Sequence, residues 1–263
     1  SLGVLPQDTF AYFDTGYRVS QGSIPFIDYW TVSGPFIDFF QAGLFYIFGV
    51  SWKSYILSGC LINFFITVLF YLTLKEFKLN RVINVFYSAC FAILANPSMG
   101  TPFPDHFSSF LSLAGILIFF ILIKKKESYY WLVIPFLFFI SFFSKQTPAA
   151  YLFIGFILMI SIYYFLFKKM FFLKYFFVSS LFCFVSFYIF LSTYDINFEL
   201  FLDQYIFYPQ TIGSFRLEKY VINLNFLNQF KFILLANLFV VFNIIYLIKE
   251  KKIKKEKEKI LIN

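Results

Sequence analysis

The sequence predicts an all-α, polytopic helical membrane protein, and composition, residue periodicity and the length of the apolar segments all favour this class. Hydrophobic residues make up 60% of the 263 residues, aromatic residues make up 25%, and the mean hydropathy is +0.76. A soluble domain of this composition would lack the polar surface that its core requires. The apolar stretches do not alternate with a period of two, so helices are favoured over a membrane β-barrel.

Seven apolar segments are long enough, or nearly so, to cross a hydrocarbon core as helices, which takes about 20 residues. The predicted spans are residues 55–74, 82–97, 106–123, 129–144, 148–167, 175–191 and 232–248. They define a predicted bundle over residues 55–248, with external loops near 98–106, 144–150 and 192–231.

Basic and acidic residues fall in alternate loops of this bundle, and the net charge is +8. Lysines and arginines gather in residues 75–81, 124–126 and 168–174 and in the tail 249–263. The positive-inside rule therefore places these segments in the cytoplasm and residues 1–54 outside it. The tail follows a predicted span and also contains glutamates, so we expect an anchor near anionic lipid rather than a nucleic-acid contact.

The first external segment, residues 1–54, is expected to contain two interfacial helices joined by a turn-rich linker. In "DTFAYFDTGYRV" the aromatic residues recur on one helical face. In "FIDFFQAGLFYIFG" Asp38, Gln41 and Ala42 lie opposite a Phe-rich face, which is typical of a helix at a membrane interface. Gly and Pro in "QGSIPF" and "VSGPF" break the chain between the two helices.

The residues that could carry chemistry are carboxylates and a few basic groups on the external side. The chain lacks the GxxxxGK, GxGxxG, HExxH and GxSxG motifs, and its single histidine excludes a His-rich metal site. Charge near mid-membrane, which ion pumps and proton-coupled carriers need, is absent from the predicted spans. A carboxylate can remove a proton from an acceptor hydroxyl, and a basic group can hold a leaving phosphate. This set suits glycosyl transfer from a lipid-phosphate sugar.

Residues 6–150 resemble the GT-C superfamily of integral-membrane glycosyltransferases, which use polyprenyl-phosphate-linked sugars. The stretches "QDTFAYFDTGYRV", "GSIP", "SGPF" and "IFGVS" follow in the order typical of the first extracytoplasmic loop of that superfamily. A second acidic motif, "PDHFSSF", and a "KQTP" turn come later, again in the expected order. Thr9 stands where the family often has a second acidic residue, and Ser33 and Gly34 stand where a basic residue often precedes the proline turn.

The resemblance implies that Asp8 and Asp105 are catalytic and that Lys145 binds substrate. A divalent cation could sit between Asp8 and Asp105, and no other cofactor is implied. Each residue also has a structural interpretation. Asp8 or Asp105 could cap a helix, and Lys145 could extend from a span end toward water.

Three further residues, Arg18, His106 and Arg216, are candidates for binding substrate. Arg18 lies four residues after Asp14, so an ion pair within one helix is expected there. His106 could be an ordinary interface residue. The two remaining acids of the first loop, expected to be solvated or to cap turns, are Asp28 and Asp38.

The implied partners are a polyprenyl-phosphate sugar donor, membrane lipid and an extracytoplasmic acceptor, in a bacterial inner membrane with the site facing outward. One alternative is a non-catalytic transporter or flippase of lipid-linked saccharides, which would carry polar residues along a path through the bilayer. Another is an inactive fragment. Because Ser1 is predicted to lie outside without a preceding signal peptide, we expect a further membrane helix upstream of it.

Overall fold

The computed structural model describes most of the chain as helices, and no β-strand occurs in the described part. The described residues are 6–31, 33–95, 102–123, 129–167, 170–218, 228, 230, 231, 233–235, 237–239, 241, 242, 245, 246, 249 and 250. The side chains of residues 6–9, 166, 167 and 216–218 lie outside this description.

In the described part of the chain, four helices are long and apolar enough to cross a membrane, which supports the all-α membrane class. They are α3 (Trp52–Glu76), α5 (Pro104–Leu122), α7 (Gln146–Phe167) and α8 (Leu173–Thr193). Each corresponds to one predicted span. The helix starts follow local chemistry, since Ser51 caps α3 by accepting from the Ser54 amide and Pro104 occupies the first turn of α5.

Two other predicted spans form helices that are shorter than expected. Helix α4 (Arg81–Leu94) has 14 residues, and the segment Tyr129–Phe142 consists of the 3₁₀ helix η1 (Tyr129–Leu132) followed by α6 (Val133–Phe142). A straight α-helix of that length reaches about 21 Å, whereas a hydrocarbon core is about 30 Å thick. The seventh predicted span, residues 232–248, lies partly outside the described residues. The count of seven therefore stays a prediction.

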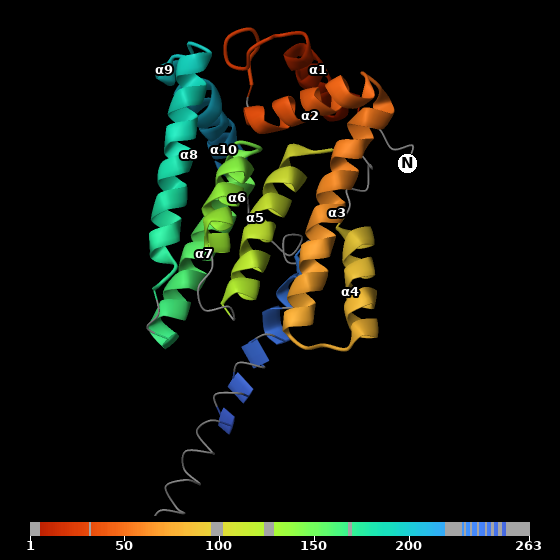
Figure 1. The fold of residues 1–263 in the computed structure, drawn as a ribbon, viewed down its shortest axis with the longest axis vertical. Coiled ribbons are helices and arrows are strands. Elements are labelled where there is room, and N and C mark those ends of the chain that lie inside the picture. Colours follow the sequence, from red (N-terminus) through yellow and green to blue (C-terminus); the bar gives the residue numbers. More distant parts are fainter. Residues whose placement is uncertain are drawn as a thin grey trace, which may run out of the picture. The chain divides into compact units, whose positions relative to one another are not determined.

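Helices α3 to α8 stand side by side, and two N-terminal helices lie across one end of this bundle (Figure 1). These are α1 (Pro6–Ser20) and α2 (Pro35–Phe48). We call α1, the loop of residues 21–34 and α2 the cap. The two helices expected in the first segment are thus present, and their location at a membrane interface stays a prediction.

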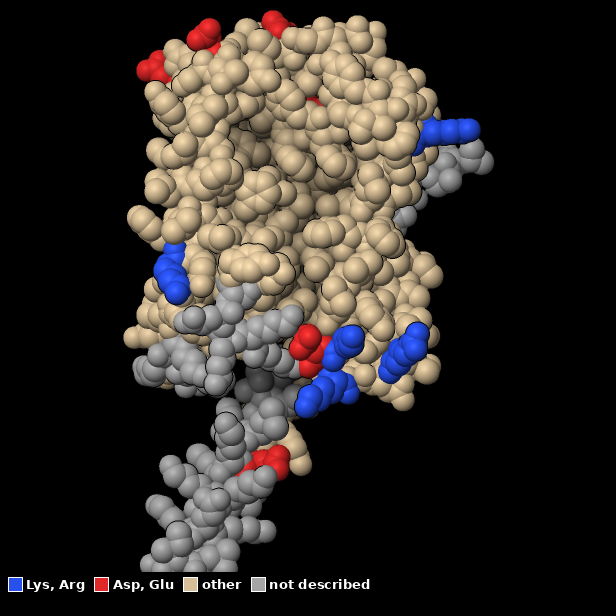
Figure 2. Space-filling view, in the orientation of Figure 1, with Lys and Arg blue, Asp and Glu red and all other residues tan. Residues whose placement is uncertain are grey.

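Charged side chains differ between the two ends of the bundle. Figure 2 shows several acidic side chains at the cap end of the visible face, whereas most of the basic ones lie toward the other end, where an acidic side chain lies beside them. The turn between α3 and α4 and the start of α8 both lie at the end opposite the cap (Figure 1). This agrees with the alternation of charge predicted for the loops.

Within residues 194–218, three short elements follow α8. They are α9 (Phe198–Leu202), the π-helix η2 (Asp203–Phe207) and α10 (Tyr208–Glu218). A second compact unit begins at Ile212, and its described residues other than Phe230 are helical, with the Leu234 amide bonded to the Phe230 carbonyl at 2.9 Å.

Helix α5 is the centre of the bundle. In its most apolar stretch 56% of the residues are buried, compared with 17% in the corresponding stretches of α3, α7 and α8. Small polar side chains let α6 approach it closely, because Ser141 is hydrogen-bonded to Ser112 at 2.6 Å and to the Ser108 carbonyl at 2.6 Å. Such contacts are common between helices in membranes, where they satisfy polar groups away from water.

Candidate functional site

The residues Asp105 and Lys145 meet at the cap end of the bundle. The Lys145 ammonium nitrogen lies 3.3 Å from Asp105 Oδ2. Asp105 is in the first turn of α5, and Lys145 immediately precedes α7. The Lys145 backbone is held in place because its carbonyl accepts a hydrogen bond from the Ser108 hydroxyl at 2.7 Å. Two residues that the sequence predicted for the site are therefore brought together from motifs 40 positions apart.

This ion pair remains accessible from solvent. The side chains of Lys145 and Asp105 keep 29% and 40% of their surface exposed. Exposed pairs of this kind contribute only about 0–1 kcal/mol, because water solvates both charges well. An incoming anion can therefore replace the Asp105 carboxylate on Lys145 at small cost.

Asp8 lies in α1, and its side chain is outside the described residues. The helix itself lies near the start of α5, because the Tyr12 ring contacts the Phe103 ring with centroids 6.1 Å apart. Residue 8 is one helical turn before Tyr12, and Phe103 is two residues before Asp105. The structure therefore brings the helix that carries Asp8 close to Asp105, while the separation of the two carboxylates stays untested.

The other predicted substrate-binding residues have different surroundings. His106 is partly buried between the rings of Phe103 and Phe110, and its Nδ1 has no hydrogen-bond partner among the described residues. Arg18 donates from Nε to Asp14 Oδ2 at 2.7 Å on the exposed side of α1, which confirms the predicted ion pair. Arg216 falls in α10, with its side chain outside the described part.

A metal site is not evident in the described residues. They contain no group of three or more His, Cys, Asp and Glu side chains that could hold a metal ion. The cation expected between Asp8 and Asp105 lies outside that finding, because the Asp8 carboxylate is not described.

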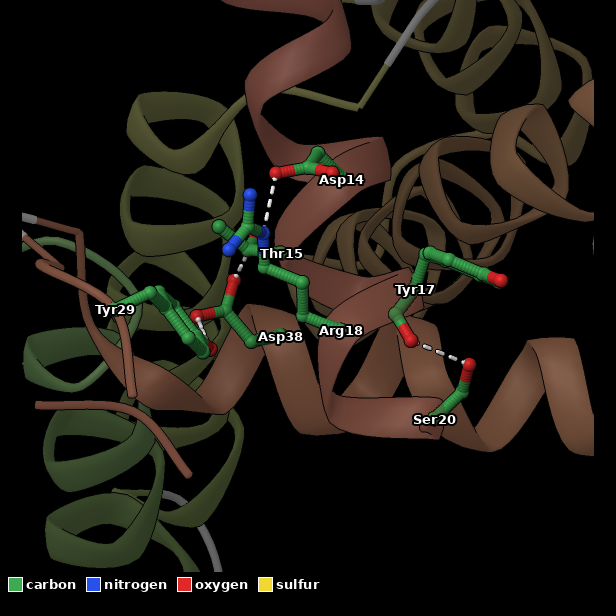
Figure 3. Close-up of polar contacts among 7 residues, drawn as sticks. All are labelled: Asp14, Thr15, Tyr17, Arg18, Ser20, Tyr29 and Asp38. Carbon is green, nitrogen blue, oxygen red and sulfur yellow. Dashed lines mark hydrogen bonds and ion pairs between the residues drawn. The ribbon is translucent and has the colours of Figure 1, made fainter. Parts of the chain in front are cut away.

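Asp38 differs most from its predicted role. A solvated or capping residue was expected, but this interpretation is wrong, since Asp38 is only 1% exposed. Its Oδ1 accepts a hydrogen bond from the Thr15 hydroxyl at 2.6 Å, and its Oδ2 accepts one from the Tyr29 hydroxyl at 2.8 Å (Figure 3). Burial raises the pKa of the Asp38 carboxyl to about 7, although both hydrogen bonds act in the opposite direction.

Asp38 is buried because both faces of α2 are covered. Its Phe-rich face contacts the bundle, with the Phe40 ring 5.8 Å from that of Phe107 and the Phe39 ring 6.0 Å from that of Phe190. Its polar face, which would meet water in an interfacial helix, meets α1 instead. The burial of Asp38 could have been inferred from one feature of the sequence. Asp38 is a single acid within an apolar helix, on the same face as Gln41, which is also buried.

Asp28 has the capping role that was expected. Its Oδ2 accepts a hydrogen bond from the Ile24 amide at 2.6 Å. That bond closes a turn in which Pro25 and Phe26 are the central residues, and the Ile27 amide bonds the Ile24 carbonyl at 3.3 Å. Phe26 has a φ of +72°, a conformation that favours glycine, and burial of its ring, which is 1% exposed, offsets the strain.

The "SGPF" segment docks on the turn between α6 and α7. The Gly34 amide donates to the Ser144 carbonyl at 3.1 Å, and the Phe36 amide donates to the Phe143 carbonyl at 3.0 Å. A Cβ at position 34 would lie 1.7 Å from the Phe143 oxygen, so only glycine fits. The turn that precedes Lys145 is thereby fixed to the cap.

The π-helix η2 fixes the loop from its other side. Gln204 is 3% exposed, and its side chain accepts from the Thr31 amide at 3.2 Å and donates to the Phe26 carbonyl at 2.9 Å. The Gln146 side chain donates to the Tyr205 carbonyl at 3.0 Å. Segments about 175 positions apart thus meet around the Lys145 turn.

An apolar groove of about 460 Å³ lies along α6, α7 and α8. Its lining includes Phe138, Phe142, Phe153, Phe184 and Phe187. Phe142 and Ala149, which are both among the lining residues, lie on either side of the α6–α7 turn.

No family model, no curated protein and no solved structure matches this chain. The fold and the site together define a helical membrane protein with a carboxylate–ammonium pair at the cap end of its bundle.

Proposed function

We propose that this chain is, or forms part of, an integral-membrane glycosyltransferase of GT-C type. It would transfer a sugar from a polyprenyl-phosphate donor to an acceptor glycan, lipid or protein outside the cytoplasm, with its site on the outer face of a bacterial inner membrane. The observation that carries the proposal is the contact between Asp105 and Lys145 at the start of α5, next to α1.

The chemistry follows from the two charges. The acceptor hydroxyl oxygen attacks the anomeric carbon of the donor sugar, and the bond from that carbon to the phosphate oxygen breaks. The electron pair leaves with polyprenyl phosphate, whose negative charge Lys145 would neutralise. The hydroxyl proton passes to a carboxylate, which we assign to Asp8 or Asp105. A divalent cation held by the same two carboxylates would bind the donor phosphate.

Two further features support this assignment. The groove along α6, α7 and α8 is lined mainly by phenylalanine rings, so it suits the isoprenoid chain of the donor. The concentration of basic residues at the end opposite the cap favours a site facing away from the cytoplasm.

The test is transfer of a labelled sugar from polyprenyl phosphate in membranes that carry the full-length protein. Asp8→Asn and Asp105→Asn each keep side-chain shape and remove the charge, and the variant that lacks the base should lose about 10²–10⁴-fold in rate. Lys145→Gln should raise the KM for the donor as well as lower the rate.

Asp14→Asn is the matched control, because it makes the same change in the exposed ion pair of α1. It should leave transfer near normal. Near-normal transfer by both Asp8→Asn and Asp105→Asn would refute the proposed mechanism. Movement of lipid-linked saccharide across the bilayer without any transfer would favour the flippase instead.

A further inference from the structure

The contact between α1 and α2 is unusually close, and Asp38 lies within it. A Cβ at Gly16 would come within 2.6 Å of the Gln41 side chain, so the two helices touch there. Thr15 is next to Gly16, and its hydroxyl donates a hydrogen bond to Asp38, which lies three positions before Gln41 on α2. Asp38 is therefore the buried polar anchor of the crossing.

The register of α1 connects this anchor to the candidate site. Positions 8, 12 and 15 follow one another at spacings of four and three, so they share one stripe of the helix. Thr15 is bonded to Asp38, and Tyr12 contacts Phe103 and accepts a hydrogen bond from the Ser33 hydroxyl at 3.3 Å. The rotation of α1 about its axis is thus set at Thr15 and Tyr12, one or two turns from residue 8.

We propose that Asp38 is a positioning residue whose carboxyl group holds α1 through Thr15 and the loop of residues 21–34 through Tyr29. Loss of these two bonds would free α1, and with it residue 8, from the start of α5. The consequence for residue 8 in catalysis rests on the proposed function. We call the hydrogen bonds of Asp38 with Thr15 and Tyr29 the clamp, and the clamp involves only residues that the structure describes.

Docking of α1 is coupled to protonation of the Asp38 carboxyl group. Besides Thr15, the groups that interact with Asp38 are the hydroxyls of Tyr29, Tyr55 and Tyr205. The exposed charges of Asp14 and Arg18 act on Tyr29. When α1 lifts away, the carboxyl meets water and its pKa returns toward about 4. Docking then favours the protonated acid. Docking of α1 is strongest below about pH 4, weakens as the pH rises to about 7, and is constant above that pH.

Hydrogen exchange of the α1 amides in the detergent-solubilised full chain tests the clamp without any assay of activity. In the wild-type protein the protection of α1, corrected for the intrinsic exchange rate, should fall at least ~10-fold between pH 5 and pH 8. Asp38→Asn should abolish this pH dependence, because the neutral amide can donate to one hydroxyl and accept from the other.

Asp38→Ala leaves the hydroxyls of Thr15 and Tyr29 without their acceptor, so α1 should lose roughly tenfold or more of its protection at pH 5, where the wild-type carboxyl group is protonated. Asp14→Asn is the control and should follow the wild type, because it changes an exposed acid on the same helix. Unchanged protection of α1 in Asp38→Ala, or wild-type protection as independent of pH as that of Asp38→Asn, would overturn the proposal.

Sugar transfer supplies a second readout that a merely structural role would not move. Asp38→Asn should remove the break near pH 7 from the rate profile while keeping activity, and Asp38→Ala should lower kcat more than it raises KM. If exchange follows these expectations and no variant, including the wild type, transfers sugar, the clamp is supported and the proposed function is refuted.

Discussion

The cap and the helices α7 and α8 differ in which kinds of side chain they bury and which they expose. The cap buries polar groups, among them Thr31, Asp38 and Gln41, each at most 3% exposed. Helices α7 and α8 expose apolar ones instead, for example Phe165 at 73% and Phe177 at 72%. Exposed rings cost little in a lipid environment, whereas a buried polar group costs free energy unless it is hydrogen-bonded.

The difference shows where the geometry of this protein is specified. Hydrogen bonds have fixed lengths and directions, so the cap tolerates few changes in its contacts. Dispersion contacts between apolar side chains and lipid have no such direction. Substitutions of the same kind should therefore have large effects in the cap and small ones on α7, α8 and the exposed face of α1.

The largest expected effect is that of Gly34→Ala. The new Cβ would lie 1.7 Å from the Phe143 carbonyl oxygen, and relief of this clash would break the two backbone hydrogen bonds between "SGPF" and the α6–α7 turn. The φ of Gly34 is −67°, so the cost is steric and not conformational. We expect a loss of more than about 3 kcal/mol of stability, measured by unfolding in detergent.

Gly155→Ala is the counterpart in α7. No atom lies within 4 Å of a Cβ there, and alanine is the better helix former by about 0.5–1 kcal/mol. This variant should be as stable as the wild type or slightly more so. Equal destabilisation by the two glycine substitutions would show that the cap is no more sensitive to substitution than α7.

A smaller effect is expected from Gln204→Ala. The change leaves the buried Thr31 amide and the Phe26 carbonyl without their partner, and each such group costs about 1–3 kcal/mol. The free energy of unfolding should fall by about 2 kcal/mol or more. Limited proteolysis should cut the loop of residues 21–34 faster.

Gln210→Ala removes the same side chain from an exposed position in α10. It should shift the free energy of unfolding by less than about 0.5 kcal/mol. A Gln204→Ala protein as stable as Gln210→Ala would show that the bridge does not hold the loop.

The smallest effect should come from Arg18→Gln. The side chains of Arg18 and Asp14 are 50% and 55% exposed, and an exposed i,i+4 pair contributes about 0.3–0.5 kcal/mol. That contribution should vanish in 1 M salt, where the Debye length is about 3 Å. A larger loss, or one insensitive to salt, would mean that Arg18 belongs with the buried contacts of the cap.

Local contacts were predictable from the sequence, and the Asp14–Arg18 pair is the clearest case. Its partners are four positions apart, so helical geometry alone brings them together. Asp28 also bonds four positions away, and its capping role was expected. By contrast, the partners of Asp38 lie 23 and 9 positions away on separate elements, and no local pattern identifies them.

The membrane class and the four described helices that are long enough to cross a membrane could be predicted from the sequence, because segment length and hydropathy act along the chain without reference to partners. The sequence also predicted the motifs of Asp105 and Lys145. The contact between these two side chains and the inward orientation of the polar face of α2 could not be predicted, because they arise in the folded protein. Each of these depends on which surfaces meet, and the free energy of a buried carboxylate such as Asp38 is set by the hydroxyl groups that the fold brings to it.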